Sequence, residues 1–516
     1  MATTHTAYAR IRQHTLGDTL REQARSRPQL LAGIDGEVRL TYLQLDRRVN
    51  QLAAALRGHG VTQGSRMLWM AQNSFRLLEL LLAAAKLGAV VCPANWRVSQ
   101  AEGKMVLEDF DPCVVFWQGG EVGELSQSLR QSDSAKRLWI QQDSLSANEG
   151  YEALLAGQST ADVDVEIDGD LPLLAVYTAA FDGRPNAALL SHTTLLLQGL
   201  ISMQGQLVDE KSVYLASGPM FHVGVMMGVL GTFIAGGCNI FVARVQAAEL
   251  LALIANEKAS HGYIAQPTIE QMRALNADGR HDLSSLFAKP DMSDWRMPLV
   301  MPAAAPLMKT MGGYGQTEIG GLSVMVWLGG SGAGRPSPFV QVKVVDGNGE
   351  ECPPGQTGEI VVRGAMVMCG YHNRPEENAA RTDLGWHRTH DLGLRKEDGS
   401  LVFVGPKTTM IKSGVENIYP AEVESCLRSH PDVQDVCVIG VPDPTWQQNV
   451  KAVVVARAGK QPTAESLIEH CRERIASYKK PKHVTFVDSL PRTGAGMLDR
   501  TAVDAAHGGG GYPKVG

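Results

Sequence analysis

The stretch from Gly405 to Glu424, GPKTTMIKSGVENIYPAEVE, has the residue types of a segment that meets a ligand. A turn and a strand-like run lead into a helix, since Pro420 suits the first helical position. Ser413 and Gly414 lie just before that helix, and a glycine lets the backbone approach another molecule closely because it has no side chain. The stretch therefore predicts a loop whose backbone borders a binding site.

Two further sets of side chains are suited to binding a ligand. Asp391 stands in the sequence WHRTHD, and a carboxylate can accept hydrogen bonds from two hydroxyl groups at once. Met220, Met226 and Met227 lie in or beside a glycine-rich apolar run, Val223 to Cys238. Methionine adapts to irregular apolar shapes, so this run is typical of a pocket wall for a bulky apolar group. Plain core packing explains each individual methionine about as well.

The composition is that of a soluble globular protein with more than one domain. The chain has 516 residues, of which 44% are hydrophobic and 20% charged, and this length predicts at least two domains. The net charge of −6 argues against nucleic-acid or anionic-membrane binding, since such proteins usually carry a basic excess. The run at 223–238 is shorter than a membrane span of about 20 residues. The amino terminus, MATTHTAYARIRQHT, lacks the apolar core of a signal peptide.

Eight cysteines are scattered along the chain, and no two of them form a CxxC pair. Separate thiols in a reducing compartment explain this pattern better than disulfides or a zinc site do. We therefore expect a cytoplasmic protein that binds neither nucleic acid nor membrane.

Alternating helix and strand signals predict an α/β fold for most of the chain. Apolar residues at helical spacing predict helices within 41–60 and at 75–87, and a strand-like apolar run follows each helix, as in a layered α/β domain. After about residue 405 the pattern changes to a compact α+β unit of ordinary domain size. We predict a large N-terminal domain of layered sheets and helices, a small mobile C-terminal domain and a flexible tail, at 1–405, 406–505 and 506–516.

The order of several motifs resembles the adenylate-forming superfamily, in its acyl-CoA synthetase or ligase branch. These motifs are GPMFHVG, GGYGQTE, TGEIVVRG, the WHRTHD box and IKSGVENIYPAEVE, and the combination of YGQTE with the last of them is highly specific. The resemblance covers nearly the whole chain and implies two half-reactions. A carboxylic acid and ATP give an acyl-adenylate and pyrophosphate, and CoA displaces AMP after the small domain has rotated.

The resemblance implies an adenylate site made of five residues. Tyr314 would lie beside the adenine, next to Gln316, and Thr317 would bind the AMP phosphate. Asp391 would hold the ribose hydroxyls. Glu318 matches the residue that binds magnesium in family members, and it would do so here only if adenylation persists.

Two other groups of residues match the acyl and CoA sites of the family. The first group would line the acyl pocket: Phe221, His222, Met226, Met227 and Gly313. The second would form the loop that faces CoA during thioester formation: Lys412, Ser413 and Gly414. Lys479 and Lys480 are candidates for the CoA phosphates, although a solvated basic patch is the more common explanation for either lysine alone.

The positions that serve the triphosphate depart from the family. The family's phosphate loop reads roughly YTSGTTGxPKG, and its hydroxyls, free backbone and lysine are what a triphosphate needs. This chain instead has Ala179, Ala180, Phe181, Asp182 and Asn186 there. Met497 replaces the lysine of the C-terminal box, and losing one such preorganised donor costs about 3–4 kcal/mol, or roughly 10²–10³ in rate. In the hinge box, Pro406 and Thr409 replace an arginine and an acid.

These departures favour an acyl-CoA ligase that does not adenylate. It would take a preformed acyl-adenylate from a separate adenylating enzyme, transfer the acyl group to CoA and release AMP, without ATP or magnesium. The pattern resembles the non-adenylating acyl-CoA ligase of platensimycin and platencin biosynthesis, which implies a bulky, diterpenoid-derived acid. Two alternatives stay open. One is a complete ATP-dependent synthetase in which Lys407 or Arg184 compensates, and the other is an inactive relative that binds acyl-adenylate.

Overall fold

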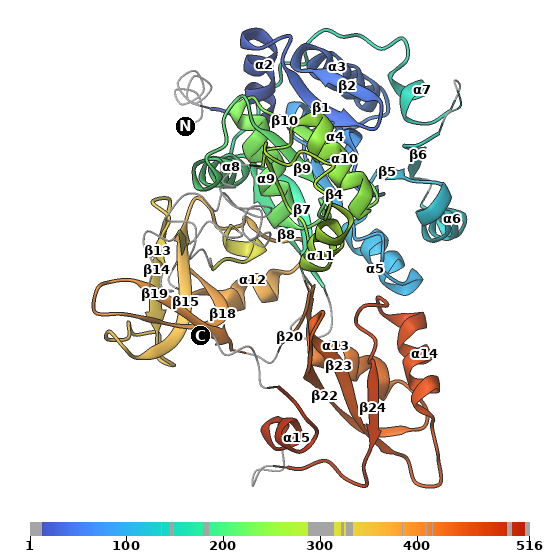
Figure 1. Ribbon diagram of the computed structural model, residues 1–516, viewed down its shortest axis with the longest axis vertical. Coiled ribbons are helices and arrows are strands. Elements are labelled where there is room, and N and C mark those ends of the chain that lie inside the picture. The colour runs from blue at the N-terminus through green and yellow to red at the C-terminus, as the bar shows by residue number, and fades with distance from the viewer. Residues whose placement is uncertain are drawn as a thin grey trace, which may run out of the picture.

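The chain folds into a large N-terminal domain and a smaller C-terminal domain, which lies at one end of the molecule (Figure 1). The computed structural model describes residues 13–135, 137–144, 146, 149–178, 185–286, 314–320, 325–326, 334–383, 385–407, 410–414, 416–492 and 498–510. The predicted α/β class, with a large layered domain and a small C-terminal domain, is confirmed. The predicted boundary at 405/406 falls at the end of strand β19 (Leu401–Pro406).

The largest sheet has seven strands in the order β16-β8-β7-β4-β3-β5-β6. Its strands are β3 (Arg66–Met70), β4 (Val90–Pro93), β5 (Val114–Trp117), β6 (Leu138–Gln141), β7 (Pro172–Thr178), β8 (Asn186–Ser191) and β16 (Gly370–Tyr371). Strands β3 to β7 pair in parallel, so their carboxyl ends meet at one edge of the sheet. Met70, Pro93 and Thr178 end three of these strands, and that edge is where ligands bind in open α/β sheets.

Two more sheets complete the large domain. One has the order β11-β9-β10-β1-β2 and consists of β1 (Leu31–Asp35), β2 (Val38–Thr41), β9 (Val213–Ala216), β10 (Cys238–Phe241) and β11 (His261–Gly262). The other is antiparallel and consists of β14 (Val340–Val345), β15 (Thr357–Gly364), β17 (Thr382–Asp383), β18 (Trp386–Arg395) and β19. A short ribbon joins β12 (Met325–Val326) to β13 (Arg335–Pro336). Asp391 lies on β18, so the antiparallel sheet carries the carboxylate predicted to bind the ribose.

Capping residues fix the ends of the two helices predicted near the amino terminus. Helix α3 (Tyr42–Gly58) follows Thr41, whose hydroxyl accepts a hydrogen bond from the backbone of Gln44 while the Gln44 side chain bonds back. Helix α4 (Phe75–Leu87) ends at Gly88 with φ 69°, a left-handed conformation that glycine adopts readily. Both predicted helices are confirmed.

The remaining helices of the large domain cover its sheets. They are α2 (Leu16–Ser26), η1 (Gly120–Val122), α5 (Gln100–Phe110), α6 (Gly123–Ser132), α7 (Tyr151–Leu155), α8 (His192–Gln206), α9 (Val223–Ala235), α10 (Ala247–Glu257), α11 (Gln266–Leu275), η3 (Thr317–Ile319) and α12 (Pro375–Arg381). Helix α4 is apolar on nearly all sides, and it lies buried in the main core, as such helices do. No helix of the described residues is both long enough and apolar enough to cross a membrane.

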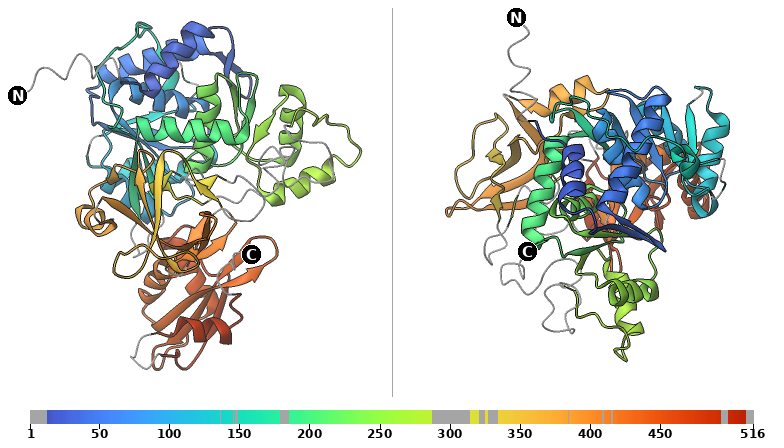
Figure 2. Two further views of the ribbon diagram at one scale, coloured as in Figure 1. Left: turned by 90° about the vertical axis from the view of Figure 1, so that its left-hand side faces the viewer. Right: turned by 90° about the horizontal axis from the view of Figure 1, so that it is seen from above.

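The small domain is one sheet covered by helices, and the left-hand view of Figure 2 shows it below the large domain. Its strands are β20 (Ile411–Ser413), β21 (Glu416–Ile418), β22 (Val433–Asp443), β23 (Gln447–Ala456) and β24 (His483–Phe486). Its helices are α13 (Pro420–Arg428), α14 (Ala464–Arg474) and α15 (Arg500–Ala506). Pro420 begins α13, as predicted. All eight cysteines of the chain are free.

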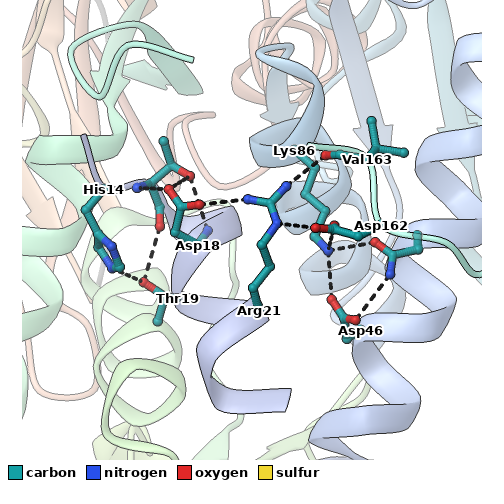
Figure 3. A network of polar contacts seen from close by, with 10 residues as sticks. His14, Asp18, Thr19, Arg21, Asp46, Lys86, Asp162 and Val163 are labelled. Atoms are coloured by element: carbon teal, nitrogen blue, oxygen red, sulfur yellow. Dashed lines mark hydrogen bonds and ion pairs between the residues drawn. The ribbon is translucent and has the colours of Figure 1, made fainter. Parts of the chain in front are cut away.

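A buried lysine ties the first helices of the large domain together (Figure 3). Lys86 of α4 is fully buried, and its ammonium group donates hydrogen bonds to Asp46, Asn50 and Asp162 over 2.6–2.8 Å. Arg21 of α2 reaches the same Asp162 at 2.6 Å. The network thus joins α2, α3 and α4 to the connection that follows α7.

Candidate active site

A cavity of about 580 Å³ lies between the two domains. Its walls come from the carboxyl edge of the seven-stranded sheet, the antiparallel sheet and the small domain. The residues lining it include Met70, Pro93, Thr178, Phe221, His222, Tyr314, Gln316, Thr317, Glu318, Asp391, Lys412, Glu416, Tyr419, Tyr478 and Lys479. Three of the predicted site groups, those for the adenylate, the acyl group and CoA, are represented here, although they come from distant parts of the chain.

The antiparallel sheet supplies a polar wall around Asp391. The hydroxyl of Tyr314 donates a hydrogen bond to its carboxylate at 2.9 Å, and the Gln316 amide donates a second one. The same amide donates to the backbone carbonyl of Thr389 at 2.9 Å. The ring of Tyr314 stacks on Phe403, with 5.1 Å between the ring centroids. The structure therefore brings Tyr314, Gln316 and Asp391 together.

The protonation of Asp391 is set by its surroundings. Burial raises its pKa to about 6, although hydrogen bonds from Tyr314 and Gln316 lower it. The carboxylate form only accepts hydrogen bonds, whereas the protonated form also carries a donor, so the hydrogen-bonding capacity of Asp391 changes near that pH. The pKa of Tyr314 is raised by burial and by the nearby carboxylate, so its hydroxyl stays protonated as a donor.

Glu318 lies beside Thr317 in the short helix η3 and is also buried. Its carboxylate accepts a hydrogen bond from the hydroxyl of Tyr371 at 2.8 Å. Among the described residues, no group of three or more histidine, cysteine, aspartate or glutamate side chains gathers to hold a metal ion. Glu318 is thus the one carboxylate that the family resemblance marks for magnesium, and its protein partner in the structure is a tyrosine.

The small domain closes the opposite side of the cavity with the hairpin β20–β21. Lys412 on β20 lines the cavity, and burial lowers its pKa. Ser413 ends β20, and Gly414 follows in the turn, where it adopts φ 60°. Glu416 begins β21, and its carboxylate lies 2.9 Å from Arg97 and 3.4 Å from His222. The hairpin is therefore held against the large domain by charged contacts.

Lys479 lies at the boundary between the two domains and bonds to a carboxylate of each. Its ammonium group donates to Glu422 at 2.6 Å and to Glu102 of the large domain at 2.8 Å. It is only 5% exposed, and the two carboxylates raise its pKa against the effect of burial. In this structure its charge is matched by two carboxylates, and its candidacy for a CoA phosphate stays a prediction. Lys480 donates to the backbone and hydroxyl of Ser477.

The predicted acyl pocket is only partly assembled at the cavity. Phe221 and His222 stand on its wall, just before α9. Met226 and Met227 are buried within α9, and Met226 belongs to the main core. Neither methionine is among the described residues that line the cavity. Gly313 lies outside the described residues, so its role stays a prediction.

The departures from the family pattern fall mostly outside the described residues. This holds for Ala179, Ala180, Phe181, Asp182 and Met497, as it does for Thr409. The described neighbours of the first group, Thr178 and Pro185, line the cavity. Asn186 is described, and its side-chain oxygen accepts a hydrogen bond from Arg374 at 2.7 Å. Arg374 in turn pairs with Asp109 at 2.8 Å, and both of these side chains are buried.

Comparison with known families assigns the chain. The model of the AMP-binding enzyme family matches residues 20–372, and that of the AMP-binding enzyme C-terminal domain matches residues 422–497. The chain belongs to the AMP-binding enzyme family. It falls in the acyl-CoA ligase branch of the adenylate-forming superfamily, as the motif order predicted.

Curated relatives in the AMP-binding family cover almost the whole chain. The feruloyl-CoA synthase of an Amycolatopsis species is 34% identical over 500 residues, or 95% of this chain and 98% of that protein. The indoleacetate–CoA ligase of Aromatoleum aromaticum is 32% identical over 90% of this chain and 92% of its own length. The long-chain-fatty-acid–CoA ligase FadD13 of Mycobacterium tuberculosis is 30% identical over 95% and 97%.

Solved structures of the family agree with the fold. A fatty acyl CoA synthetase of Mycobacterium tuberculosis aligns with a TM-score of 0.67 and 27% identity, over 96% of this chain and 98% of that one. The o-succinylbenzoate CoA synthetase of Bacillus subtilis reaches a TM-score of 0.77 at 24% identity, over 94% and 97%. At that identity the second likeness speaks for the fold alone.

Sequence reasoning missed four residues at or behind the cavity of this AMP-binding enzyme. They are Arg97, Tyr371, Arg381 and Glu416. Glu416 lies inside the motif IKSGVENIYPAEVE, so its position in a cavity-facing loop was an available signal. The other three stand in unremarkable contexts. Only the folded chain brings Tyr371 to Glu318, Arg381 to Tyr371 and Arg97 to Glu416.

Proposed function

We propose that this acyl-CoA ligase catalyses the thioester-forming half-reaction without the adenylating one. It takes an acyl-adenylate made by a separate enzyme and transfers the acyl group to CoA, releasing AMP. In this proposal the adenylate wall is Tyr314, Gln316, Thr317, Glu318 and Asp391. The hairpin β20–β21 faces CoA, and the small domain rotates about the connection that follows β19.

The observation that carries the proposal is a contrast between Lys412 on the cavity wall and Asn186, which follows the wall residue Pro185. Lys412, in the hairpin that the family uses for thioester formation, lines the cavity. Asn186, at the position of the family's phosphate-binding lysine, is neutral and binds Arg374 instead. A neutral amide cannot offset the charge of a triphosphate as a lysine does. The side of the site that meets CoA is therefore better equipped than the side that meets pyrophosphate.

The chemistry needs little beyond orientation. The sulfur of CoA attacks the carbonyl carbon of the mixed anhydride, and a carbon–sulfur bond forms. The bond from that carbon to the phosphate oxygen breaks, AMP leaves with the electron pair, and the thiol proton passes to solvent. AMP is already a good leaving group, so holding the thiol near the carbonyl supplies most of the acceleration.

One assay tests the proposal. The purified chain is given CoA and either synthetic acyl-AMP or the free acid with ATP and magnesium. We expect acyl-CoA to form when CoA is supplied with synthetic acyl-AMP, and not when it is supplied with the free acid, ATP and magnesium. Acyl-CoA from the acid with ATP, in the absence of a partner, would reject the proposal.

A substitution sharpens this test. Met497→Lys restores the family residue, yet we expect no adenylation from it, because the sequence departures at Phe181 and Asp182 persist. Strong adenylation by this variant would mean that Met497 was the decisive loss.

A complete ATP-dependent synthetase is the second candidate function. It is favoured by the curated relatives, which are named CoA ligases and CoA synthases over nearly their full length. Of the two cations suggested to compensate, Lys407 bonds to Glu359 at 3.0 Å, and Arg184 is outside the described residues. An inactive acyl-adenylate-binding protein would give no product from either supply.

The acyl group in this proposal is bulky and apolar, and a diterpenoid-derived acid of natural-product biosynthesis fits the resemblance best. The relatives are named for feruloyl, indoleacetate and long-chain fatty-acid substrates, so aromatic and long-chain acids belong in the same assay. Comparing the rates for their synthetic adenylates would rank the three classes.

A further inference from the structure

The adenylate wall holds two buried carboxylates and must accept a third negative charge. Glu318 is 4% exposed and Asp391 is 8% exposed. An adenylate adds the charge of its phosphate to this wall. Buried charges are tolerated when an opposite charge lies near them, so the site needs a cation.

The cations that the family would place here are missing or engaged elsewhere. Pro406 and Met497 stand where an arginine and a lysine are expected, and Asn186 replaces the lysine of the phosphate loop. Of the lysines that line the cavity, Lys479 is matched by two carboxylates, and Lys412 lies on the hairpin beside Glu416.

Arg381 brings a positive charge to the back of this wall. It is the last residue of α12 and is 6% exposed. Its guanidinium carbon lies 5.5 Å from the centre of the Tyr371 ring, and the hydroxyl of Tyr371 donates to Glu318 at 2.8 Å. Burial raises the pKa of Asp391 and of Tyr371, and the charge of Arg381 opposes the rise in both.

Arg381 does not stand on the wall of the substrate cavity. It lines a second, smaller cavity of about 310 Å³, together with Arg363, Trp386 and His387. The ring of Tyr371 lies between its guanidinium and Glu318. Any effect of Arg381 on a bound adenylate must therefore pass through Tyr371 and through the electric field, without direct contact.

We propose that Arg381 is a positioning residue whose charge, acting through Tyr371, lets the wall of Glu318 and Asp391 accept the phosphate of an adenylate. This rests on the proposed adenylate site but not on which half-reaction the enzyme performs. A cation over an aromatic ring makes the hydroxyl a better donor to the carboxylate, and the same charge offsets the added phosphate.

Binding of AMP and of adenosine to the full chain tests the proposal, since the two ligands differ by the phosphate alone. Calorimetry should show that Arg381→Gln weakens AMP binding by about tenfold while adenosine binding changes by less than about twofold. Arg381→Lys keeps the charge and should retain most of the AMP affinity. Arg363→Gln is the matched control, because it removes an arginine from the same second cavity, and both affinities should stay unchanged.

Three results would overturn the proposal. In the first, Arg381→Gln binds AMP as tightly as the wild type. In the second, it loses affinity for adenosine and AMP equally. In the third, Arg381→Lys loses as much AMP affinity as Arg381→Gln, which would indicate a packing role. Should Arg381→Gln fail to fold, Tyr371→Phe carries the test. It removes the hydroxyl that reaches Glu318 and should likewise weaken AMP more than adenosine. Acyl-CoA formed from acid and ATP would reject the proposed function, yet leave this AMP-to-adenosine difference standing.

Discussion

Lys86 and Lys479 are both buried lysines that bind two carboxylates, but the carboxylates lie in different surroundings. The ammonium group of Lys86 lies 2.7 Å from Asp46 and 2.8 Å from Asp162, all within the large domain (Figure 3). The side chain of Asp162 is 35% exposed, so part of its charge is solvated by water. Lys86 therefore holds one domain together, whatever the position of the small domain.

The ion pairs of Lys479 cross between the domains. One carboxylate, Glu422, belongs to the same small domain, and the other, Glu102, lies on α5 of the large domain. All three side chains are at most 11% exposed. A lysine with two buried carboxylates leaves a net negative charge out of water, which is costly unless the geometry is kept. Lys479 thus links the packing inside the small domain to the contact between the small domain and the large one.

The largest effect is expected at Lys86. Lys86→Met should lower the free energy of unfolding of the large domain by about 3 kcal/mol, because it leaves Asp46 and Asp162 without their shared cation in a packed site. Urea unfolding of the variant and the wild type measures this loss. A change below about 0.5 kcal/mol would mean that the network behaves like surface ion pairs.

Glu102 tests the crossing bond of Lys479 without disturbing the small domain. Glu102→Gln keeps an acceptor for the backbone of Ser99, which starts α5, and leaves the Lys479–Glu422 bond intact. We expect thioester formation from synthetic acyl-AMP to slow by about tenfold, since domain motions commonly control such steps. Small-angle scattering should show a less compact average arrangement. An unchanged rate with an unchanged scattering curve would remove the coupling assigned to Lys479.

Local signals explain why the fold class and much of the site were predictable. Thr41 and Gly88 bound helices through chemistry that is visible over four residues. Tyr314 and Asp391 are 77 residues apart, yet both lie in short motifs whose order is distinctive, and they meet through a hydrogen bond. Motif order therefore identified two residues that meet on the cavity wall, which periodicity alone would not have brought together.

Contacts that depend on a partner elsewhere in the chain could not be predicted from the sequence. Lys479 is one of several basic residues near the end of the chain, and nothing nearby in the sequence shows that Glu102, 377 residues earlier, neutralises it. Arg381 ends a helix, where a basic residue is ordinarily explained by the helix dipole. Its nearness to Tyr371 follows from the packing of α12 against β16, the strand that contains Tyr371.

Acidification should separate the two lysine sites. Burial raises the pKa of Glu422 above its ordinary 4.5, and the pull of Lys479 does not cancel the rise. Its contribution to stability is therefore complete below pH 4.5 and is lost as the pH rises through the raised pKa. Glu422→Gln removes this loss. As the pH rises from 4.5, the unfolding free energy of the variant should therefore increase relative to that of the wild type.

For Asp162, which lies beside Lys86, the pKa shift and its effect on stability have the opposite sign. Burial would raise its pKa, but hydrogen bonds from Arg21 and Lys86 outweigh it, and the pKa lies below the ordinary 3.8. Its contribution is present above pH 3.8 and is lost as the pH falls through the lowered value. Asp162→Asn should therefore lose stability relative to the wild type above pH 3.8 and converge with it in stronger acid. If the unfolding free energies of both variants followed that of the wild type in parallel as the pH changed, the two sites would not differ in this way.

The smallest effect is expected at Lys104, which lies two residues after Glu102 on the same helix. Its side chain is 62% exposed, and its ammonium group lies 3.7 Å from Glu108, a solvated pair of the kind that contributes little. Lys104→Met should change the unfolding free energy by less than about 0.5 kcal/mol and leave thioester formation unchanged. The variant also serves as the control for Glu102→Gln, because each removes one charged side chain from α5, although the two charges have opposite sign. If both slowed thioester formation equally, a general disturbance of α5 would be responsible, and the buried bond from Glu102 to Lys479 would not be.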